Sequence, residues 1–225
     1  MPRHSIIIPV LNGAAHVKEA LASALIQLGM DDEIIVVDNG STDATQQILQ
    51  TYADGRIRML SEARRGPAAA RNTGVRAARG ELISFLDHDD LWPPERQRGL
   101  VAALAANPAA NAAYGRVRMQ FDDGPDPNFD NIDGQHAPQV AIFSFMFRRA
   151  LLESVGPMDE TLLFGEDTDY FPRLQAGGMI SAIYEGDAAI YRRHATNMTH
   201  DRGAVADAVL QVMARNIARR RNQKP

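Results

Sequence analysis

Short apolar runs alternate with segments of helical periodicity through the first half of the chain. Residues 5–10 are the first such run and predict a strand. Residues 14–28 follow with apolar side chains at helical spacing, among them Val17 and Leu21, and predict a helix. Residues 33–37 are rich in β-branched side chains without polar alternation, which is typical of a strand buried on both faces. The same criteria predict a helix beginning after Asp43, a helix at residues 67–78, and strands at residues 56–60 and 81–86.

The second half of the chain has a less regular pattern. A segment rich in Asp, Pro, Gly and Asn at residues 122–138 predicts a loop. Around it we expect helices at residues 94–106, 148–155, 167–175 and 204–221, and strands at residues 112–121, 139–147 and 179–184. This order is typical of an α/β fold, a mostly parallel sheet with helices on both faces. No internal repeat or linker divides the sequence, so we expect a single domain over residues 1–225.

The composition excludes several classes of protein. With 24 basic and 28 acidic residues, the formal charge of −4 is opposite in sign to that of a protein that holds nucleic acid through its phosphates. Cysteine is absent, which excludes disulfide scaffolds and cysteine nucleophiles and fits a reducing, cytoplasmic location. No segment offers the roughly 20 apolar residues of a membrane span, and the run at residues 6–11 is shorter than a signal-peptide core.

Polar residues follow the strands of the predicted sheet. Asn12 and Gly13 follow the first strand, residues 38–43 follow the second, and residues 87–90 follow the fourth. Open parallel sheets bind ligands at the carboxyl ends of their strands. We therefore expect the functional site at this edge of the sheet.

Residues 87–90, Asp-His-Asp-Asp, place three carboxylates within four positions at a strand end. Such carboxylates repel one another unless a cation or hydrogen bonds compensate. A divalent ion is the natural compensation, because Mg²⁺ or Mn²⁺ binds through one or two carboxylates together with substrate phosphates. The alternative is a solvated acidic turn that caps the helix beginning near Pro93 and Pro94.

The loop at residues 38–43 suits contact with a nucleotide. Gly40 allows close approach of a ligand to the backbone, and the side chains of Asp38 and Asn39 can hydrogen-bond a base or a ribose. The alternative is an ordinary turn in which Asp43 caps the next helix, with Gln46 completing a capping box. Neither the dinucleotide-binding glycine fingerprint nor a Walker A motif occurs in the chain.

Three further residues carry candidate chemistry. Arg71 lies on a helix of small residues and can aim at a diphosphate, or it can be a surface arginine. Asp167 comes near the start of a helix, where the dipole lowers its pKa, so a role as a base requires burial or the neighbouring Glu166 and Asp169 to raise it. The alternative for Asp167 is simple capping of the helix. His194 by itself decides nothing, because a lone histidine is usually structural or exposed.

Several short motifs, taken in order, resemble those of the family-2 glycosyltransferases, which have the GT-A fold. The resemblance covers about residues 4–199. It is carried by residues 5–12, 35–43, 70–74, 78–83, 85–90 (the Asp-x-Asp metal motif), 147–149, 155–160, 165–167 and 191–194.

The resemblance implies an α/β, GT-A-like (Rossmann-like) domain that moves a sugar, with inversion, from a nucleotide-diphosphate sugar to an acceptor hydroxyl. A UDP-sugar is the first candidate donor, and Mn²⁺ or Mg²⁺ the implied cofactor. It divides the chain into a donor-binding half (residues 1–120), an acceptor-binding half (residues 121–203) and a terminal helix with a basic tail (residues 204–225). By position, it assigns donor binding to Pro9, Asp38, Asn39, Arg71, Asp87 and His88, the metal to Asp89 and His194, and the catalytic base to Asp167.

Two departures from the family pattern affect the expected donor and the expected type of enzyme. Asn39 stands where many relatives have a second Asp, which leaves the identity of the base open. The chain lacks a Gln-x-x-Arg-Trp motif, which argues against a processive synthase. The alternative functions are a sugar-nucleotide-binding relative without transfer activity, a sugar nucleotidyltransferase and, more weakly, a phosphatase with an aspartate nucleophile.

The acceptor is expected to be a saccharide or a lipid-linked sugar in bacterial polysaccharide or glycolipid synthesis. Residues 122–138 can form a flap over that acceptor or an ordinary surface loop. The helix at residues 204–221 ends in a cluster of arginines, which can be a solvated tail or a peripheral contact with the inner face of an anionic membrane. A homodimer is a further option that the sequence leaves open.

Overall fold

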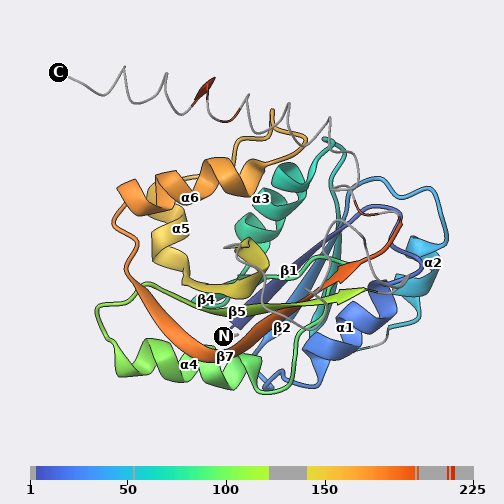
Figure 1. Cartoon of the computed structure of the whole chain (residues 1–225). Helices are drawn as coiled ribbons and strands as arrows, with labels where there is room; N and C mark the ends of the chain where they lie inside the picture. The colour runs from blue at the N-terminus through green and yellow to red at the C-terminus, as the bar shows by residue number, and fades with distance from the viewer. Residues whose placement is uncertain are drawn as a thin grey trace.

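A seven-stranded sheet runs through the middle of the molecule in the computed structural model (Figure 1), which describes residues 4–52, 54–121, 141–195, 197, 212 and 214–215. The strand order is β3-β2-β1-β4-β6-β5-β7. The strands are β1 His4–Val10, β2 Glu33–Asp38, β3 Ile57–Ser61, β4 Leu82–Phe85, β5 Ala112–Phe121, β6 Phe145–Arg148 and β7 Ser181–Arg193. The predicted loop at 122–138 and the predicted helix at 204–221 lie outside the described residues, apart from three positions of that helix.

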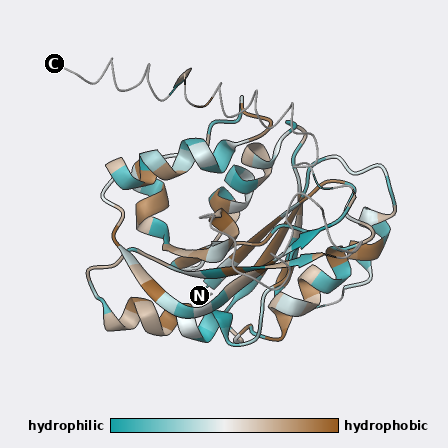
Figure 2. Cartoon of the chain, viewed as in Figure 1, coloured by the Kyte–Doolittle hydropathy of each residue, from teal (hydrophilic) through white to brown (hydrophobic). Residues whose placement is uncertain are grey.

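The first four strands form the parallel half that the apolar pattern predicts. β1 pairs in parallel with both β2 and β4, and β2 pairs in parallel with β3. Every residue of β1 and β2 is buried, which explains why neither strand shows a polar alternation. The central strands are accordingly strongly hydrophobic (Figure 2).

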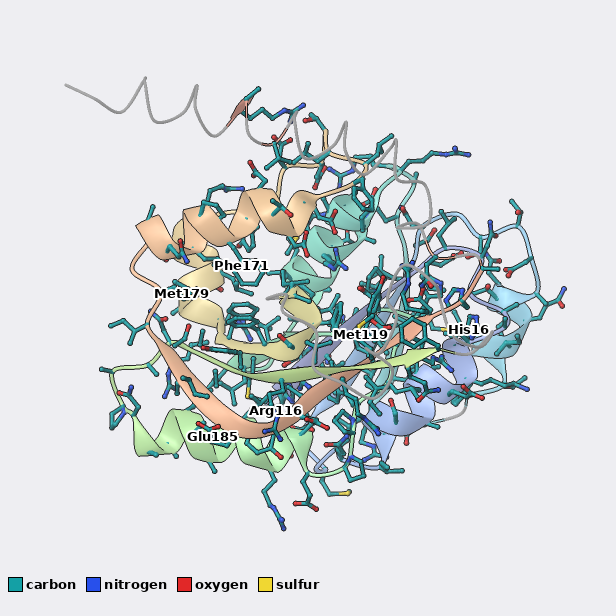
Figure 3. All side chains as sticks on the ribbon, in the orientation of Figure 1. His16, Arg116, Met119, Phe171, Met179 and Glu185 are labelled. Atoms are coloured by element: carbon teal, nitrogen blue, oxygen red, sulfur yellow. The ribbon has the colours of Figure 1, made fainter. Side chains whose placement is uncertain are left out.

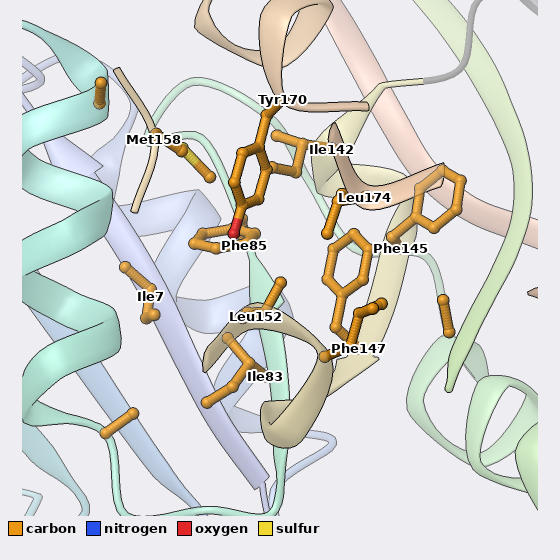
Figure 4. Packing of buried hydrophobic residues seen from close by; sticks show 14 of the residues in the cluster. Ile7, Ile83, Phe85, Ile142, Phe145, Phe147, Leu152, Met158, Tyr170 and Leu174 are labelled. Carbon is orange, nitrogen blue, oxygen red and sulfur yellow. The ribbon is translucent and has the colours of Figure 1, made fainter. Parts of the chain in front are cut away.

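Helices cover both faces of the sheet, as expected. Ile7 and Ile35 belong to a core that α3, α5 and α6 complete, whereas Ile6 and Ile34 belong to a core formed with α1. Figure 4 shows Ile7, from β1, in the first of these cores, to which Tyr170 of α6 also belongs. The helices are α1 Val17–Leu25, α2 Thr45–Gln50, α3 Pro67–Ala77, α4 Arg96–Ala106, α5 Arg149–Val155 and α6 Glu166–Ala176.

The second half differs from the prediction at two strands. β6 is antiparallel to both of its neighbours, and it spans only four residues because a 3₁₀ turn, η2 (Ile142–Ser144), occupies part of the predicted strand at 139–147. β7 continues to Arg193 rather than ending at residue 184. Since β5 is antiparallel to β6, and β6 to β4, β5 and β7 point in the same direction as β1.

The length of β7 depends on a bulge opposite β5. The register slips twice near Arg116, and two glycines, Gly115 and Gly186, meet there. A Cβ on Gly115 would lie 2.7 Å from the carbonyl oxygen of Gly186, so this approach requires glycine. Beyond the bulge β7 curves across the sheet (Figure 1), and Ile190 forms an antiparallel bridge with Leu91. The carboxyl end of β7 is thereby brought next to the turn that follows β4.

Arg96, at the start of α4, anchors this curved strand to that helix. Its side chain is fully buried, with the guanidinium 3.7 Å from the centre of the Trp92 ring. It donates hydrogen bonds to the carbonyl oxygens of Ala188 in β7 (2.7 Å) and Phe145 in β6 (3.0 Å). One buried arginine therefore holds two strands of the sheet, β6 and β7, against α4.

Candidate active site

The carboxyl ends of β1, β2 and β4 form the edge of the sheet at which the site is expected. Pro9 lies near the end of β1, where this strand separates from the chain that follows β4. The carbonyl of Ile7 still accepts from Leu86 on the β4 side, at 3.0 Å. Strand alternation directs Pro9 to the same side, where β4 has already ended at Phe85. Proline therefore removes no ladder hydrogen bond there, and the sheet parts between β1 and the turn at residues 87–90.

Asp38 ends β2 and is buried at the edge. Its Oδ1 accepts from the backbone N–H of Ser41 (3.0 Å), and its Oδ2 accepts from the side-chain amide of Gln46 (2.6 Å). The predicted capping box is therefore not formed, because Asp38 takes the Gln46 side chain that the box requires. Asp43 does contact the start of α2, through the N–H of Thr45 at 2.9 Å.

The side chain of Asn39 is saturated by the loop that joins β3 to α3. Its amide nitrogen donates to the carbonyl oxygens of Glu62 (2.9 Å) and Arg64 (2.6 Å). Its carbonyl oxygen accepts from the N–H of Gly66 at 2.9 Å. Both amide hydrogens of Asn39 are therefore used within the protein. A nucleobase that accepted a hydrogen bond from Asn39, as predicted, would have to replace one of the contacts that fix this loop.

Arg71 projects from α3 to the same edge, where two carboxylates hold it. Its Nη2 lies 2.5 Å from Oδ1 of Asp87, and its Nη1 pairs with Oε1 of Glu166. The small residues of α3 allow this, because they let the helix lie close to β1; a Cβ on Gly74 would come within 2.3 Å of the Ile7 side chain. Arg71 is therefore not a surface arginine, and most of its guanidinium faces protein rather than a ligand.

Asp89 and His194 meet at the centre of the edge, from the turn after β4 and the end of β7. Oδ2 of Asp89 lies 3.3 Å from Nε2 of His194. The amide nitrogen of Asn197 is 3.4 Å from the same carboxylate oxygen and 3.2 Å from the same ring nitrogen. The His16 ring, at the start of α1 (Figure 3), stacks on His194 with 4.3 Å between centroids. The structure thus unites two residues that the motifs assigned to one role.

The neighbours of Asp89 have different environments. His88 lies against Gly13, on which a Cβ would fall 2.5 Å from the His88 ring. Asp90 is buried, and its Oδ1 accepts from the backbone N–H of Arg192 at 2.9 Å. Burial, together with the charges of Asp89 and Asp87, raises the pKa of Asp90 well above its ordinary value. Asp90 is therefore a structural member of the acidic turn that ties β7 to it.

Asp167 lies in the first turn of α6, next to Glu166. It is half-buried, and its Oδ1 accepts from the N–H of Thr168 at 2.7 Å. Burial raises the pKa of Asp167, and the nearby Arg71 guanidinium opposes that rise. The sequence required burial or neighbouring charge to offset the dipole, and burial is the larger of these effects. Gly165 is the N-cap residue of α6 and no side chain caps the helix, so Asp167 does not play the simple capping role. The raised pKa of Asp167 suits a proton acceptor.

The donor atoms of Asp89 and His194 fit a bound divalent cation. In the part of the chain that the structure describes, no group of three His, Cys, Asp or Glu side chains converges as a complete protein cage. Two converging ligands are what Mn²⁺ or Mg²⁺ needs when a substrate diphosphate supplies the rest. A mixed carboxylate and imidazole pair suits Mn²⁺ better than Mg²⁺, which prefers oxygen ligands.

Four residues of the site were not assigned from the sequence: His16, Asp90, Glu166 and Asn197. Glu166 and Asp90 adjoin predicted residues, so their neighbours in the motifs were a usable signal. Asn197 lies three positions after His194, a spacing that closes a turn in which the N–H of His194 donates to its side chain at 2.6 Å. His16 had no signal, because only the curvature of β7 brings His194 against it.

Comparison with known protein families identifies a match over most of the chain. The model described as "Glycosyl transferase family 2" matches residues 5–197. In the described part of the chain, no helix is both long and apolar enough to cross a membrane.

Two curated relatives come from Rhizobium meliloti (strain 1021). Succinoglycan biosynthesis protein ExoO is 32% identical over 155 residues, covering 68% of this chain and 44% of that protein. Succinoglycan biosynthesis protein ExoU is 32% identical over 220 residues, covering 87% of this chain and 64% of that protein. The match covers 44% of ExoO, and it covers 53% and 63% of two further curated relatives. The chain therefore spans about half the length of the curated proteins it matches.

Two solved structures share the fold at low sequence identity. S. aureus TarS in complex with UDP-GlcNAc aligns with a TM-score of 0.71 at 21% identity, over 88% of this chain and 61% of that one. The mannosyltransferase PcManGT from Pyrobaculum calidifontis, in complex with GDP-Man and Mn²⁺, aligns with a TM-score of 0.71 at 24% identity, over 96% and 64%. With the family match over residues 5–197, the chain belongs to glycosyl transferase family 2, and its fold is the GT-A fold.

Proposed function

We propose that this domain transfers a sugar from a nucleotide-diphosphate sugar to an acceptor hydroxyl, in one displacement that inverts the anomeric carbon. The observation that carries the proposal is the meeting of Asp89 and His194 at the edge where Asp38 ends β2 and Asp87 follows β4. One edge of the sheet would then carry the side chains that bind the nucleobase, the ribose and the diphosphate of the donor. Asp167, with its raised pKa, is linked to that edge through Arg71.

The donor would lie across the ends of β1, β2 and β4. Each carboxylate oxygen can accept two hydrogen bonds. Asp38, whose two oxygens each accept one bond from the protein, and Asp87, whose Oδ1 accepts from Arg71, would therefore still receive hydrogen bonds from the nucleobase or the ribose hydroxyls. The loops that frame the donor are tied together, since Asn12 accepts from the N–H of Thr42 at 2.8 Å and Ala14 donates to Asp43 at 3.1 Å. A framework fixed in this way lowers the ordering cost of binding a nucleotide.

Asp167 would act as the base. Its carboxylate takes the proton of the acceptor hydroxyl as that oxygen attacks the anomeric carbon from the face opposite the diphosphate. The bond from the anomeric carbon to the diphosphate oxygen breaks in the same step, and the nucleoside diphosphate leaves with that electron pair. No carboxylate nucleophile is required, so the mechanism differs from the two-carboxylate scheme of retaining glycosidases.

Asp89 and His194 would hold a divalent cation, with Mn²⁺ the first candidate. When bound, the ion would supply positive charge to offset the charge that develops on the departing diphosphate. The mannosyltransferase with the same fold is in complex with both GDP-Man and Mn²⁺, which supports the use of a divalent metal here.

The comparisons indicate which donors and acceptors to test first. UDP-GlcNAc and GDP-Man are the donors bound by the two solved structures, so UDP- and GDP-sugars are the first to test, with a UDP-sugar ahead on the motifs. Relatives named for succinoglycan biosynthesis favour a saccharide or lipid-linked acceptor in polysaccharide assembly.

Thermal unfolding with UDP, GDP, dTDP and CMP, each with and without Mn²⁺, tests the donor site. A nucleotide at about 100 times its Kd adds about 2.7 kcal/mol, which for a domain of this size raises Tm by roughly 5–10 °C. We expect one nucleotide to give this shift with Mn²⁺ and not in Asp89→Asn. A folded sample that responds to none of the four would contradict the proposal.

A further inference from the structure

A buried ion-pair network connects the donor edge with the start of α6. The Arg71 side chain is only 5% exposed and contacts Asp87, 16 positions away, and Glu166, 95 positions away. Both carboxylates approach terminal nitrogens of the same guanidinium. A planar fork of this kind fixes the direction of two partners at once, which a lysine cannot do.

The Glu166 carboxylate in turn fixes the first turn of α6. Glu166 follows Gly165, which has a left-handed backbone (φ 74°), and it is itself buried. The helix then begins with the N–H of Asp169 donating to the carbonyl of Gly165 at 3.1 Å. Asp167 is the next residue after Glu166, so the anchor of one side chain determines where the other lies.

Charge reinforces this geometric link. Three carboxylates surround the Arg71 guanidinium: Asp87 from the turn after β4, and Glu166 and Asp167 from α6. At Asp167, burial and the charge of Asp87 raise the pKa, whereas the Arg71 charge lowers it. At Glu166, burial and the charge of the neighbouring Asp167 raise the pKa, and the Arg71 charge lowers it.

We propose that Arg71 and Glu166 form a positioning pair, which holds the Asp167 carboxylate in place relative to Asp87 and balances the negative charge around it. The inference rests on the proposed role of Asp167 as the base. It gives Arg71 a task other than direct contact with the diphosphate, consistent with a guanidinium that two protein carboxylates occupy. Neither residue needs to touch the reacting atoms.

Opposite neutralisations of the pair supply the test. Arg71→Gln removes the positive charge, so the pKa of Asp167 should rise; Glu166→Gln removes a negative charge, so that pKa should fall. Carboxyl ¹³C NMR of aspartate-labelled protein measures this pKa directly, with the signal assigned by its loss in Asp167→Asn. Arg71→Lys keeps the charge and should stay near the wild-type pKa, even where Arg71→Gln fails to fold.

Arg76→Gln provides a matched control on the same helix. Arg76 is exposed and lies 3.7 Å from Glu62 and 3.8 Å from Glu160, so its loss should leave the titration of Asp167 unchanged. Equal titration curves in Arg71→Gln and Glu166→Gln, or shifts in the same direction, would overturn the inference.

The pH dependence of nucleoside-diphosphate release from UDP-GlcNAc or GDP-mannose gives the second readout. At a pH below the pKa of the base, Arg71→Gln should release nucleotide about tenfold more slowly and recover as the pH rises. Glu166→Gln should move the acid limb in the opposite direction. NMR measures the pKa of Asp167 without turnover. Opposite pKa shifts in the two variants, without nucleotide release from any donor, would contradict the proposed function and support the positioning pair. Nucleotide release with an unchanged low-pH profile in both variants would support the proposed function and contradict the positioning pair.

Discussion

The Asp89 carboxylate and the His194 imidazole lie 3.3 Å apart although 105 positions separate them in the chain. The contact exists because β7 runs parallel to β5, passes a bulge at Gly186 and curves until Ile190 bridges to Leu91. Arg192 strengthens this junction, since its backbone N–H donates to the buried Asp90 at 2.9 Å. The course of β7 thus brings His194, the residue that follows it, next to the turn after β4.

Removing either member of this pair should weaken Mn²⁺ binding. Loss of residues that merely orient a ligand typically costs 10–100-fold in metal affinity, so Asp89→Asn and His194→Gln should each cost at least about tenfold. Titration calorimetry with Mn²⁺ in the presence of saturating nucleoside diphosphate measures the effect. Glu95→Gln, an exposed residue on α4's N-terminal side that pairs with Arg98, is the control. Wild-type affinity in both variants would remove Asp89 and His194 from the metal site.

Asn39 should matter for stability as well as for the donor. Asn39→Ala would leave the carbonyls of Glu62 and Arg64 and the N–H of Gly66 without their partner. Leaving buried polar groups unpaired costs about 1–3 kcal/mol each, less where water enters, so we expect a total loss of about 2–4 kcal/mol in urea unfolding. Asn39→Asp should also destabilise, because a carboxylate cannot donate to two carbonyls. A stable Asn39→Asp would mean that the loop does not depend on the amide.

Gly74 sets how closely α3 approaches β1, and through it the place of Arg71. A Cβ at position 74 would lie 2.3 Å from Cγ2 of Ile7, so Gly74→Ala should cost about 1–3 kcal/mol by overpacking. Gly55→Ala adds the same methyl where no heavy atom lies within 4 Å and serves as the control. Chemical denaturation of the two variants gives the comparison. Equal stability would show that α3 can retreat from the sheet at no cost.

The stability of the fold should fall as the pH drops below 6.5, because of His4. Burial lowers the pKa of His4 to about 3 from its ordinary value of 6.5, with the Arg96 charge contributing. Below pH 6.5 the unfolded chain binds a proton that the folded chain does not, so the free energy of unfolding declines by about 1.4 kcal/mol per pH unit. His4→Phe retains an aromatic ring beside Trp92 and should flatten the curve between pH 6.5 and 5. Parallel curves for the two proteins would exclude His4 as the cause.

Much of the fold and site follows from the sequence where the physics is local. Buried β-branched runs fix β1 and β2, and the polar residues after each strand locate the edge. The prediction was wrong where one contact overrode another: Gln46 turns to Asp38 instead of completing a capping box, and a 3₁₀ turn replaces the start of β6.

The pattern of apolar and polar residues did not predict the long-range contacts. The bulge at Gly115 and Gly186 interrupts the alternation of β7, so the strand was predicted too short and its meeting with Asp89 rested on the family motif alone. The partners of Arg71 were equally hidden, because Glu166 is 95 positions away and reads from the sequence as one more acidic residue at a helix start.

Release of nucleoside diphosphate from UDP- and GDP-sugars in the presence of Mn²⁺ tests the central claim most directly. Wild-type protein should release nucleotide from one donor, and Asp167→Asn should bind that nucleotide with the same thermal shift yet release it about 10²–10⁴-fold more slowly, as expected for loss of a general base. Equal release by wild type and Asp167→Asn would contradict the assignment of the base. Nucleotide binding without release from any sugar donor, with added saccharide acceptors present, would contradict glycosyl transfer itself.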